Sequence, residues 1–152
     1  MKINKLLSIL IISLAAILLG SCSLFQAPLT EPKTLEGAKR DQVLTYASPK
    51  ADNLIAGLVA GDYTIFSADF DSTMKEGMNQ AAFEELLQQF TSKLGTYQSK
   101  EVSIVLKDQK FTTVAYKMIF EKDDAVVMRV VFDNQEPHQI TGLWFDSPEL
   151  RK

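Results

Sequence analysis

The fold of this chain is decided by residues 101–146, which read EVSIVLKDQKFTTVAYKMIFEKDDAVVMRVVFDNQEPHQITGLWFD. Apolar side chains recur there at alternate positions, which is the period of a β-strand. Three groups of turn-forming residues interrupt the alternation, at Asp108-Gln109, at Lys122-Asp123 and at residues 134–137. These breaks predict four strands joined as an antiparallel meander, over residues 102–107, 111–120, 125–132 and 139–145.

The residues before the meander have the helical period instead. Ser48-Pro49 is a typical helix start, and the apolar stripe that follows ends at Gly61. Val43, Leu44 and Ala47 are in phase with this stripe, which leaves open a longer helix with a kink at Pro49. Asp62 and Asp71 are typical caps of short helices, and Asn79 caps a clear helix that ends at Gly95. Helices followed by a meander predict an α+β fold, with the N-terminal helices packed on a four-stranded antiparallel sheet.

Turn lengths determine which side chains share a face of the sheet. With two-residue turns at Asp108-Gln109 and Lys122-Asp123, one face is almost wholly apolar and is expected to receive the helices. That face is expected to hold Val102, Ile104, Leu106, Phe111, Ala115, Ile119, Val126, Met128, Val130, Phe132, Leu143 and Phe145. The opposite face also becomes apolar over the last three strands, which is unusual for a solvated surface. Either the chain around residues 36–47 covers this second face, or another molecule does.

Four residues on the second face are the candidate partner-binding residues: Tyr116, Met118, Arg129 and Trp144. Tyr116 is expected opposite Arg129, within cation–π reach, and Gly142 leaves room for the arginine side chain. Aromatic and arginine anchors among aliphatic neighbours are typical of contact surfaces. The leading hypothesis is therefore a non-enzymatic binding or assembly module, which forms a homodimer or binds an envelope protein.

A second hypothesis is a carrier of a small apolar ligand, held between the helices and the sheet. The candidate ligand-binding residues are Lys117, Phe70 and Met128, because Lys117 is the one charge expected on the helix-covered face and lies next to Met128. A lysine there either anchors an acidic ligand or extends to the edge of the sheet. Clustered phenylalanines at helix–sheet contacts are also typical of a filled core.

An isomerase- or dehydratase-like enzyme is the third hypothesis, with Asp69, Asp71 or His138 as the acid–base groups. The two aspartates flank Phe70 and are more typical of helix caps, and the single histidine follows Pro137 in a predicted turn. We therefore assign no catalytic residue. One histidine and one cysteine also argue against a zinc site, so no metal and no cofactor is expected.

The N-terminus predicts where the protein works. Lys2 and Lys5 precede an uncharged apolar run of about 14 residues, which is shorter than the ~20 that a spanning helix needs. A positive start, a short apolar segment and a small-residue end indicate a signal peptide over residues 1–21. The sequence Leu19-Gly20-Ser21-Cys22 resembles the lipobox of bacterial lipoproteins. This resemblance implies that Cys22 becomes the first residue and carries the lipid that anchors the protein to a membrane.

The remaining chain divides into a lipidated cysteine with a proline-containing tether, residues 22–35, and a single α+β domain, residues 36–152. Residues 1–21 contain two lysines and no acid, so the net charge of −3 becomes about −5 after their removal. An acidic domain without a basic face argues against nucleic acid as a partner. We expect an exported, extracytoplasmic protein that the lipid on Cys22 holds at the membrane.

The pattern from Leu58 to Leu143 resembles a bacterial family known as domain of unknown function 3887. The resemblance rests mainly on Gly61-Asp62-Tyr63, on Phe70-Asp71-Ser72-Thr73-Met74 and on Leu94-Gly95. It implies a cystatin-like, nuclear-transport-factor-2-like cone, in which helices pack into a curved sheet, a pocket is common and the outer sheet face often forms a dimer. Some relatives precede an α/β-hydrolase, but this chain has no Gly-x-Ser-x-Gly elbow, so no such activity is expected.

Overall fold

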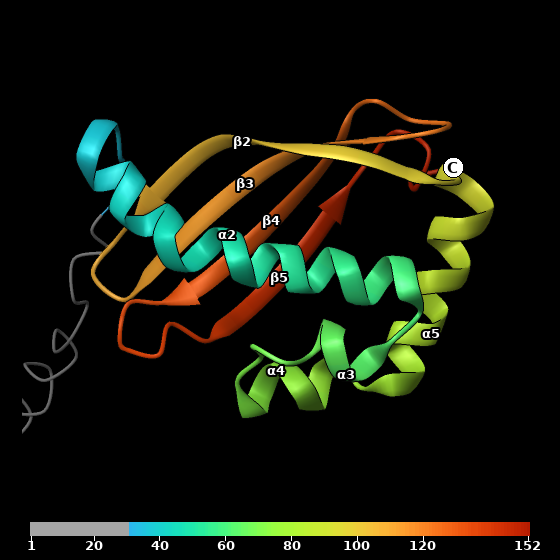
Figure 1. Cartoon of the computed structure of the whole chain (residues 1–152), viewed down its shortest axis with the longest axis horizontal. Helices are drawn as coiled ribbons and strands as arrows, with labels where there is room; N and C mark the ends of the chain where they lie inside the picture. The colour runs from blue at the N-terminus through green and yellow to red at the C-terminus, as the bar shows by residue number, and fades with distance from the viewer. Residues whose placement is uncertain (1–30) are drawn as a thin grey trace, which may run out of the picture. The chain divides into compact units, whose positions relative to one another are not determined.

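The computed structural model describes residues 31–152, in which helices precede one open antiparallel sheet (Figure 1). The α+β prediction is thereby confirmed, while the predicted signal peptide and Cys22 lie outside the described residues. The helical elements are α2 (Gly37–Ala60), α3 (Tyr63–Phe66), α4 (Ser72–Gly77), α5 (Gln80–Gln89) and the π-helical turn η1 (Phe90–Leu94). The strands are β1 (Lys33–Thr34), β2 (Tyr97–Lys107), β3 (Phe111–Phe120), β4 (Val126–Asp133) and β5 (Ile140–Asp146).

The sheet has five strands in sequence order, one more than predicted. The additional strand, β1, lies within the segment predicted as a tether and pairs antiparallel with β2. Leu35 then donates its backbone N–H to the Val105 carbonyl at 2.8 Å. The four predicted strands are all present, because each has alternating apolar residues between turn-forming breaks.

Helix α2 runs through Pro49 without interruption, so the longer of the two helix interpretations is correct. Proline removes one backbone hydrogen bond, but burial of Val43 and Ala47 upstream and of Leu54 downstream joins both halves to one core. The helix ends at Gly61, whose φ of 67° suits glycine, and Asp62 donates its N–H back to the Gly57 carbonyl.

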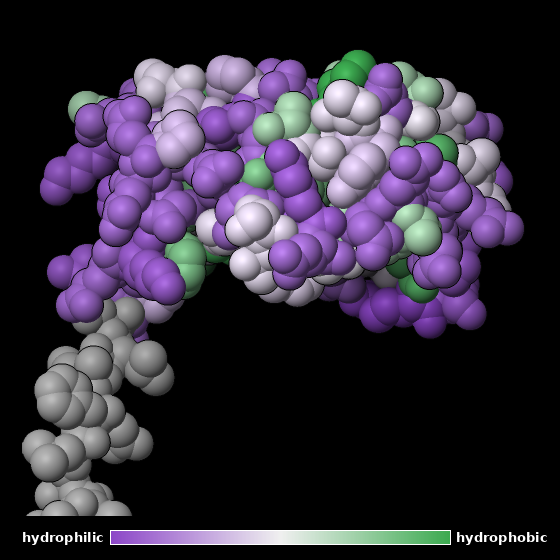
Figure 2. All heavy atoms as spheres, turned by 90° about the horizontal axis from the view of Figure 1, so that it is seen from below, coloured by the Kyte–Doolittle hydropathy of each residue, from purple (hydrophilic) through white to green (hydrophobic). Residues whose placement is uncertain are grey.

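The predicted caps of the later helices are confirmed. The side chains of Asp62, Asp71 and Asn79 accept hydrogen bonds from backbone N–H groups three residues ahead, at 3.1, 2.6 and 3.2 Å. These local bonds begin α3, α4 and α5. In Figure 1, α2 lies across one face of the sheet, and the shorter helices lie beside the C-terminal half of α2. The underside of the molecule is largely hydrophilic, with its apolar residues scattered (Figure 2).

The predicted faces of β3 are wrong by one residue. Val114, Tyr116, Met118 and Phe120 enter the core, whereas Ala115 and Lys117 face away from the helices. The cause is the loop after β3: a two-residue turn at Lys122-Asp123 would pair Tyr116 with Arg129, whereas Tyr116 pairs with Met128 and Met118 with Val126, a shift of one residue. Asp123 organises this loop, because its carbonyl oxygen accepts a hydrogen bond from the Phe120 N–H at 2.9 Å and its Oδ1 accepts one from the Ala125 N–H at 2.8 Å. In this register the Lys117 side chain remains in solvent, which avoids the cost of burying its charge.

Candidate functional site

The side of the sheet that faces away from α2 is the candidate functional surface. In β4, Val126, Met128, Val130 and Phe132 are buried, whereas Arg129 between them is exposed. The cross-strand register then places one set of side chains together on the uncovered side. We call it the outer sheet face and define it as Glu101, Ile104, Ala115, Lys117, Val127, Arg129, Val131 and Trp144.

A row of cross-strand neighbours forms the middle of this face. Ile104 pairs with Ala115, Ala115 with Arg129, and Arg129 with Trp144. Ile104 is 37% exposed and Trp144 is 56% exposed, although both are large apolar side chains in the centre of strands. The small Ala115 lies between them, so another surface can approach the sheet closely at this point.

Gly142 determines how the tryptophan lies. A Cβ atom on Gly142 would be 2.5 Å from Cη2 of Trp144 and 2.6 Å from Cζ3, so the indole ring covers the glycine backbone. The predicted role of Gly142, to make room for the Arg129 side chain, is wrong, because Arg129 pairs with Trp144 and Gly142 pairs with Val131. The ring therefore lies along the sheet and presents a broad apolar surface.

Three charges lie in this row or beside it. Glu101 on β2 lies opposite Lys117 on β3, and Arg129 lies two strands from Glu101. Within residues 31–152, none of these three side chains forms an ion pair within 4.0 Å. The outer sheet face thus combines an apolar centre with charges of both signs that are available to a partner.

Two of the predicted partner-binding residues lie on the other side of the sheet. Tyr116 and Met118 are both completely buried beneath the helices, so the expected contact of Tyr116 with Arg129 is absent. The Tyr116 hydroxyl lies 3.5 Å from the Ala47 carbonyl oxygen, and Lys100 Nζ lies 5.1 Å from the ring centroid. Burial raises the pKa of the Tyr116 hydroxyl, and the charge of Asp52 raises it further.

The predicted ligand-binding residues are not brought together either. Phe70 and Met128 are buried in the core, at 1% and 0% exposure, whereas Lys117 is exposed on the outer sheet face. Phe70 packs edge-on against Phe66, with ring centroids 5.3 Å apart. The space between helices and sheet at this level is therefore filled by side chains.

The three candidate acid–base residues have structural partners. Asp69 accepts hydrogen bonds from Lys50 at 2.7 Å and from Asn53 at 3.0 Å, while Asp71 caps α4. His138 stacks on Tyr46 with ring centroids 3.9 Å apart, and its Nδ1 lies 3.0 Å from the Asp133 carbonyl oxygen. Asp71 lines a pocket of about 200 Å³ that includes neither Asp69 nor His138. These contacts explain the three residues without a catalytic role.

Residues 31–152 contain neither a cluster of metal-binding side chains nor a membrane-spanning helix. No group of three His, Cys, Asp or Glu side chains is arranged to hold a metal ion. Among the same residues, no helix combines the length and the apolar character that crossing a membrane requires.

The sequence placed Ile104, Ala115 and Lys117 on the helix-covered face, whereas all three belong to the outer sheet face. Two signals could have placed them there. Asp123 can accept a hydrogen bond from the N–H group two residues ahead, which favours a loop after β3 that is longer than the two-residue turn assumed. A register that keeps Lys117 in solvent is also the less costly one.

One family model matches the chain. Residues 51–143, more than half of the chain, match a family model described as protein of unknown function (DUF3887). No curated protein matches the chain, and no solved structure matches it.

Proposed function

Since this chain belongs to the DUF3887 family of proteins of unknown function, we propose a role from its surface: a lipid-anchored, non-enzymatic assembly module of the cell envelope. Its outer sheet face binds a second copy of the same chain. The proposal includes the predicted signal peptide, lipid attachment at Cys22, and the cystatin-like form of the fold, in which the sheet curves around the helices.

One observation carries the proposal: helices cover only one face of the sheet, and the uncovered face has an exposed tryptophan, Trp144, on the edge strand β5. Trp144 and Ile104 leave large apolar areas in water, which association would bury. Single exposed apolar residues are common, but here both lie in one cross-strand row, on β2 and β5, with Ala115 and Arg129 between them.

Charge arrangement favours a second copy as the partner. Strands lie ~4.8 Å apart, so Glu101 and Arg129 are separated by roughly 10 Å across the sheet. A twofold axis near Ala115 would bring Arg129 of each copy to Glu101 of the second copy. Such an isologous contact uses both charges twice and closes on itself.

With the predicted lipid anchor, a weak interface is sufficient for dimers to form. Copies held on one membrane surface have a high effective concentration, so even a low affinity produces dimers there.

Analytical ultracentrifugation over a wide concentration range tests the assembly. The chain from Ser23 onward should show a monomer–dimer equilibrium, and Arg129→Glu should weaken dimerisation at least tenfold, because it places like charges together. Arg40→Glu is the matched control, since it makes the same charge change on α2 and should dimerise normally. A natural sequence that stays monomeric at millimolar concentration would remove the proposal.

Mass spectrometry of the protein from its native cell tests the anchor separately. Lipidation predicts a chain that begins at Cys22 and carries acyl groups. A product that retains Met1, or an unmodified Cys22 thiol, would contradict the envelope location whatever the oligomeric state.

A further inference from the structure

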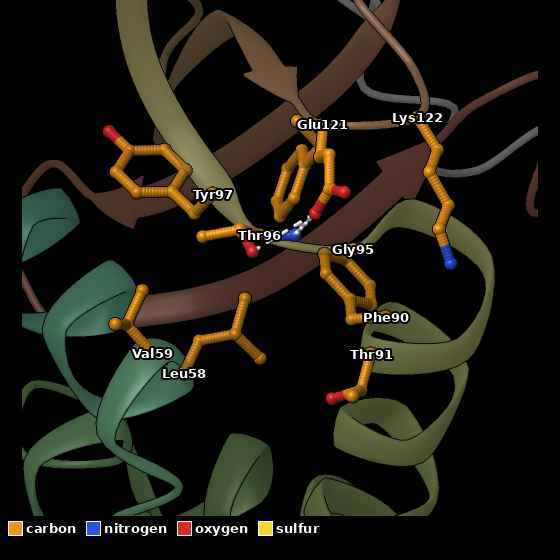
Figure 3. Close-up of a pocket in the computed structure, with 10 residues that line it drawn as sticks. Leu58, Val59, Phe90, Thr91, Gly95, Thr96, Tyr97, Glu121 and Lys122 are labelled. Carbon is orange, nitrogen blue, oxygen red and sulfur yellow. Dashed lines mark hydrogen bonds between the residues drawn. The ribbon is translucent and has the colours of Figure 1, made fainter.

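We propose that a pocket at the C-terminal end of α2 binds a small amphipathic amine, a molecule with an apolar body and a cationic head (Figure 3). The pocket has a volume of about 430 Å³, within the range of sites for small molecules. It lies at the helix–sheet boundary and includes no residue of the outer sheet face. The inference is therefore independent of the proposed assembly.

Three segments that are distant in sequence form the pocket. Leu58 and Val59 come from the last turn of α2. Phe120 ends β3, and Glu121 and Lys122 follow it. The third segment runs from η1 to the start of β2 and contributes Phe90, Thr91, Gly95, Thr96 and Tyr97. Figure 3 shows these side chains arranged around a common space.

The walls are aromatic and aliphatic. Phe120 is in edge-on contact with Phe90 on one side and with Tyr97 on the other, with ring centroids 5.6 Å apart in both pairs. Val59 at the rim is 64% exposed, more than any other large apolar side chain in residues 31–152. An apolar ligand body would contact the rings and cover this valine.

Glu121 supplies the charge that a cation would meet. Its Oε2 accepts hydrogen bonds from the Thr96 backbone N–H at 3.2 Å and from Thr96 Oγ1 at 3.1 Å. These bonds lower the pKa of the Glu121 carboxyl, so it is ionised at neutral pH. Its second oxygen, Oε1, makes no hydrogen bond within the described part of the chain and is available to a ligand.

The backbone around Glu121 requires glycine at position 95. Gly95 has a φ of 75°, and a Cβ atom there would lie 2.9 Å from Glu121 Oε2. The glycine therefore lets the carboxylate reach Thr96. Two hydrogen bonds with Thr96 and the close approach to Gly95 therefore fix the Glu121 side chain at the mouth of the pocket.

The potential of the pocket favours a cation over an anion. Both α2 and η1 end at the pocket, and helix C-termini carry partial negative charge. Asp52 is close enough to Tyr97 to raise the pKa of its hydroxyl, after the larger effect of burial. Lys122, the cation in the lining, donates to the Ser92 carbonyl at 3.1 Å, and its charge is the smallest of the contributions that lower the Glu121 pKa.

Isothermal titration calorimetry on the full chain in lipid nanodiscs tests this inference, with empty nanodiscs as the blank. The probes are 2-phenylethylamine and 3-phenylpropionate, which share an apolar body and differ in the sign of the head. We expect saturable binding of the amine and at least tenfold weaker binding of the carboxylate.

Variants assign the binding to the pocket. Glu121→Gln keeps the shape and the bonds to Thr96 but removes the charge, so it should weaken amine binding roughly tenfold or more. Glu76→Gln, on the exposed helix α4, is the matched control and should bind normally, and thermal unfolding checks that both variants fold. No amine binding at millimolar probe, an equal or stronger affinity for the carboxylate, or unchanged binding by Glu121→Gln would each overturn the inference.

Discussion

Replacing Gly57 by alanine should destabilise the protein, although alanine is the better helix former. In an open helix the change would stabilise by about 1 kcal/mol. At Gly57, however, the new Cβ would lie 2.3 Å from the backbone N of Phe66 and 2.5 Å from its Cα. Relief requires that α2 and α3 separate by roughly 1 Å, because ordinary contacts begin near 3.4 Å.

The separation is costly because Phe66 cannot yield. Its side chain is 1% exposed and packs against Phe70 and Phe83, with ring centroids 5.3 and 4.6 Å away. Overpacking of a filled core costs about 1–3 kcal/mol, and the upper end applies where backbone must move. After the propensity gain is subtracted, a net loss of about 2 kcal/mol remains.

Urea denaturation followed by circular dichroism measures this change. Gly77→Ala is the matched control: Gly77 ends α4, and a Cβ atom there would have no neighbour within 4 Å. The control should raise the midpoint slightly, while Gly57→Ala should lower it by roughly 1 M, for a slope of about 2 kcal/mol per M. A Gly57→Ala protein as stable as the natural one would refute the close α2–α3 contact.

Three further predictions concern the C-terminal half. Ser147→Ala should destabilise by about 1–2 kcal/mol in chemical denaturation, because Ser147 donates to the buried carboxylate of Asp123; a neutral result would mean that this bond is unimportant. Burial alone would raise the pKa of Asp123, but hydrogen bonds from Ser147 and from two backbone N–H groups lower it. The stabilisation by Asp123 is therefore present above its unfolded-state pKa, near 3.9, and is lost as the pH falls through its folded-state pKa. Asp123→Asn should therefore show a shallower loss of stability than the natural protein from pH 5 to pH 2, and parallel curves would contradict the assignment. Gly142→Ala should displace the Trp144 ring and shift its fluorescence emission with little loss of fold; an unchanged spectrum would show that the ring does not cover the glycine.

Element order and helix caps could be predicted because they depend on neighbours in the chain. Asp62, Asp71 and Asn79 each bond to an N–H group three residues away, so their roles are visible in a short window. The extent of α2 was less certain, since Pro49 is a local stop signal that burial on both sides of it overrides.

Half of the outer sheet face could be predicted from the alternation of side chains along single strands. Arg129 and Trp144 were assigned to one face, because alternation along β4 and β5 is regular around them. Tyr116 and Met118 were assigned to the same face and are buried on the other, since one misjudged loop length inverts a whole strand.

The sequence alone thus determined the class of fold, the order of its helices and strands, and the caps that begin the short helices, because these features arise from bonds and periodicities within a few residues. Only the tertiary structure decided the register of β3, the pairing of β1 with β2, and the pocket at the end of α2. These depend on contacts between segments tens of residues apart, where the burial of many side chains at once outweighs the preference of any single turn.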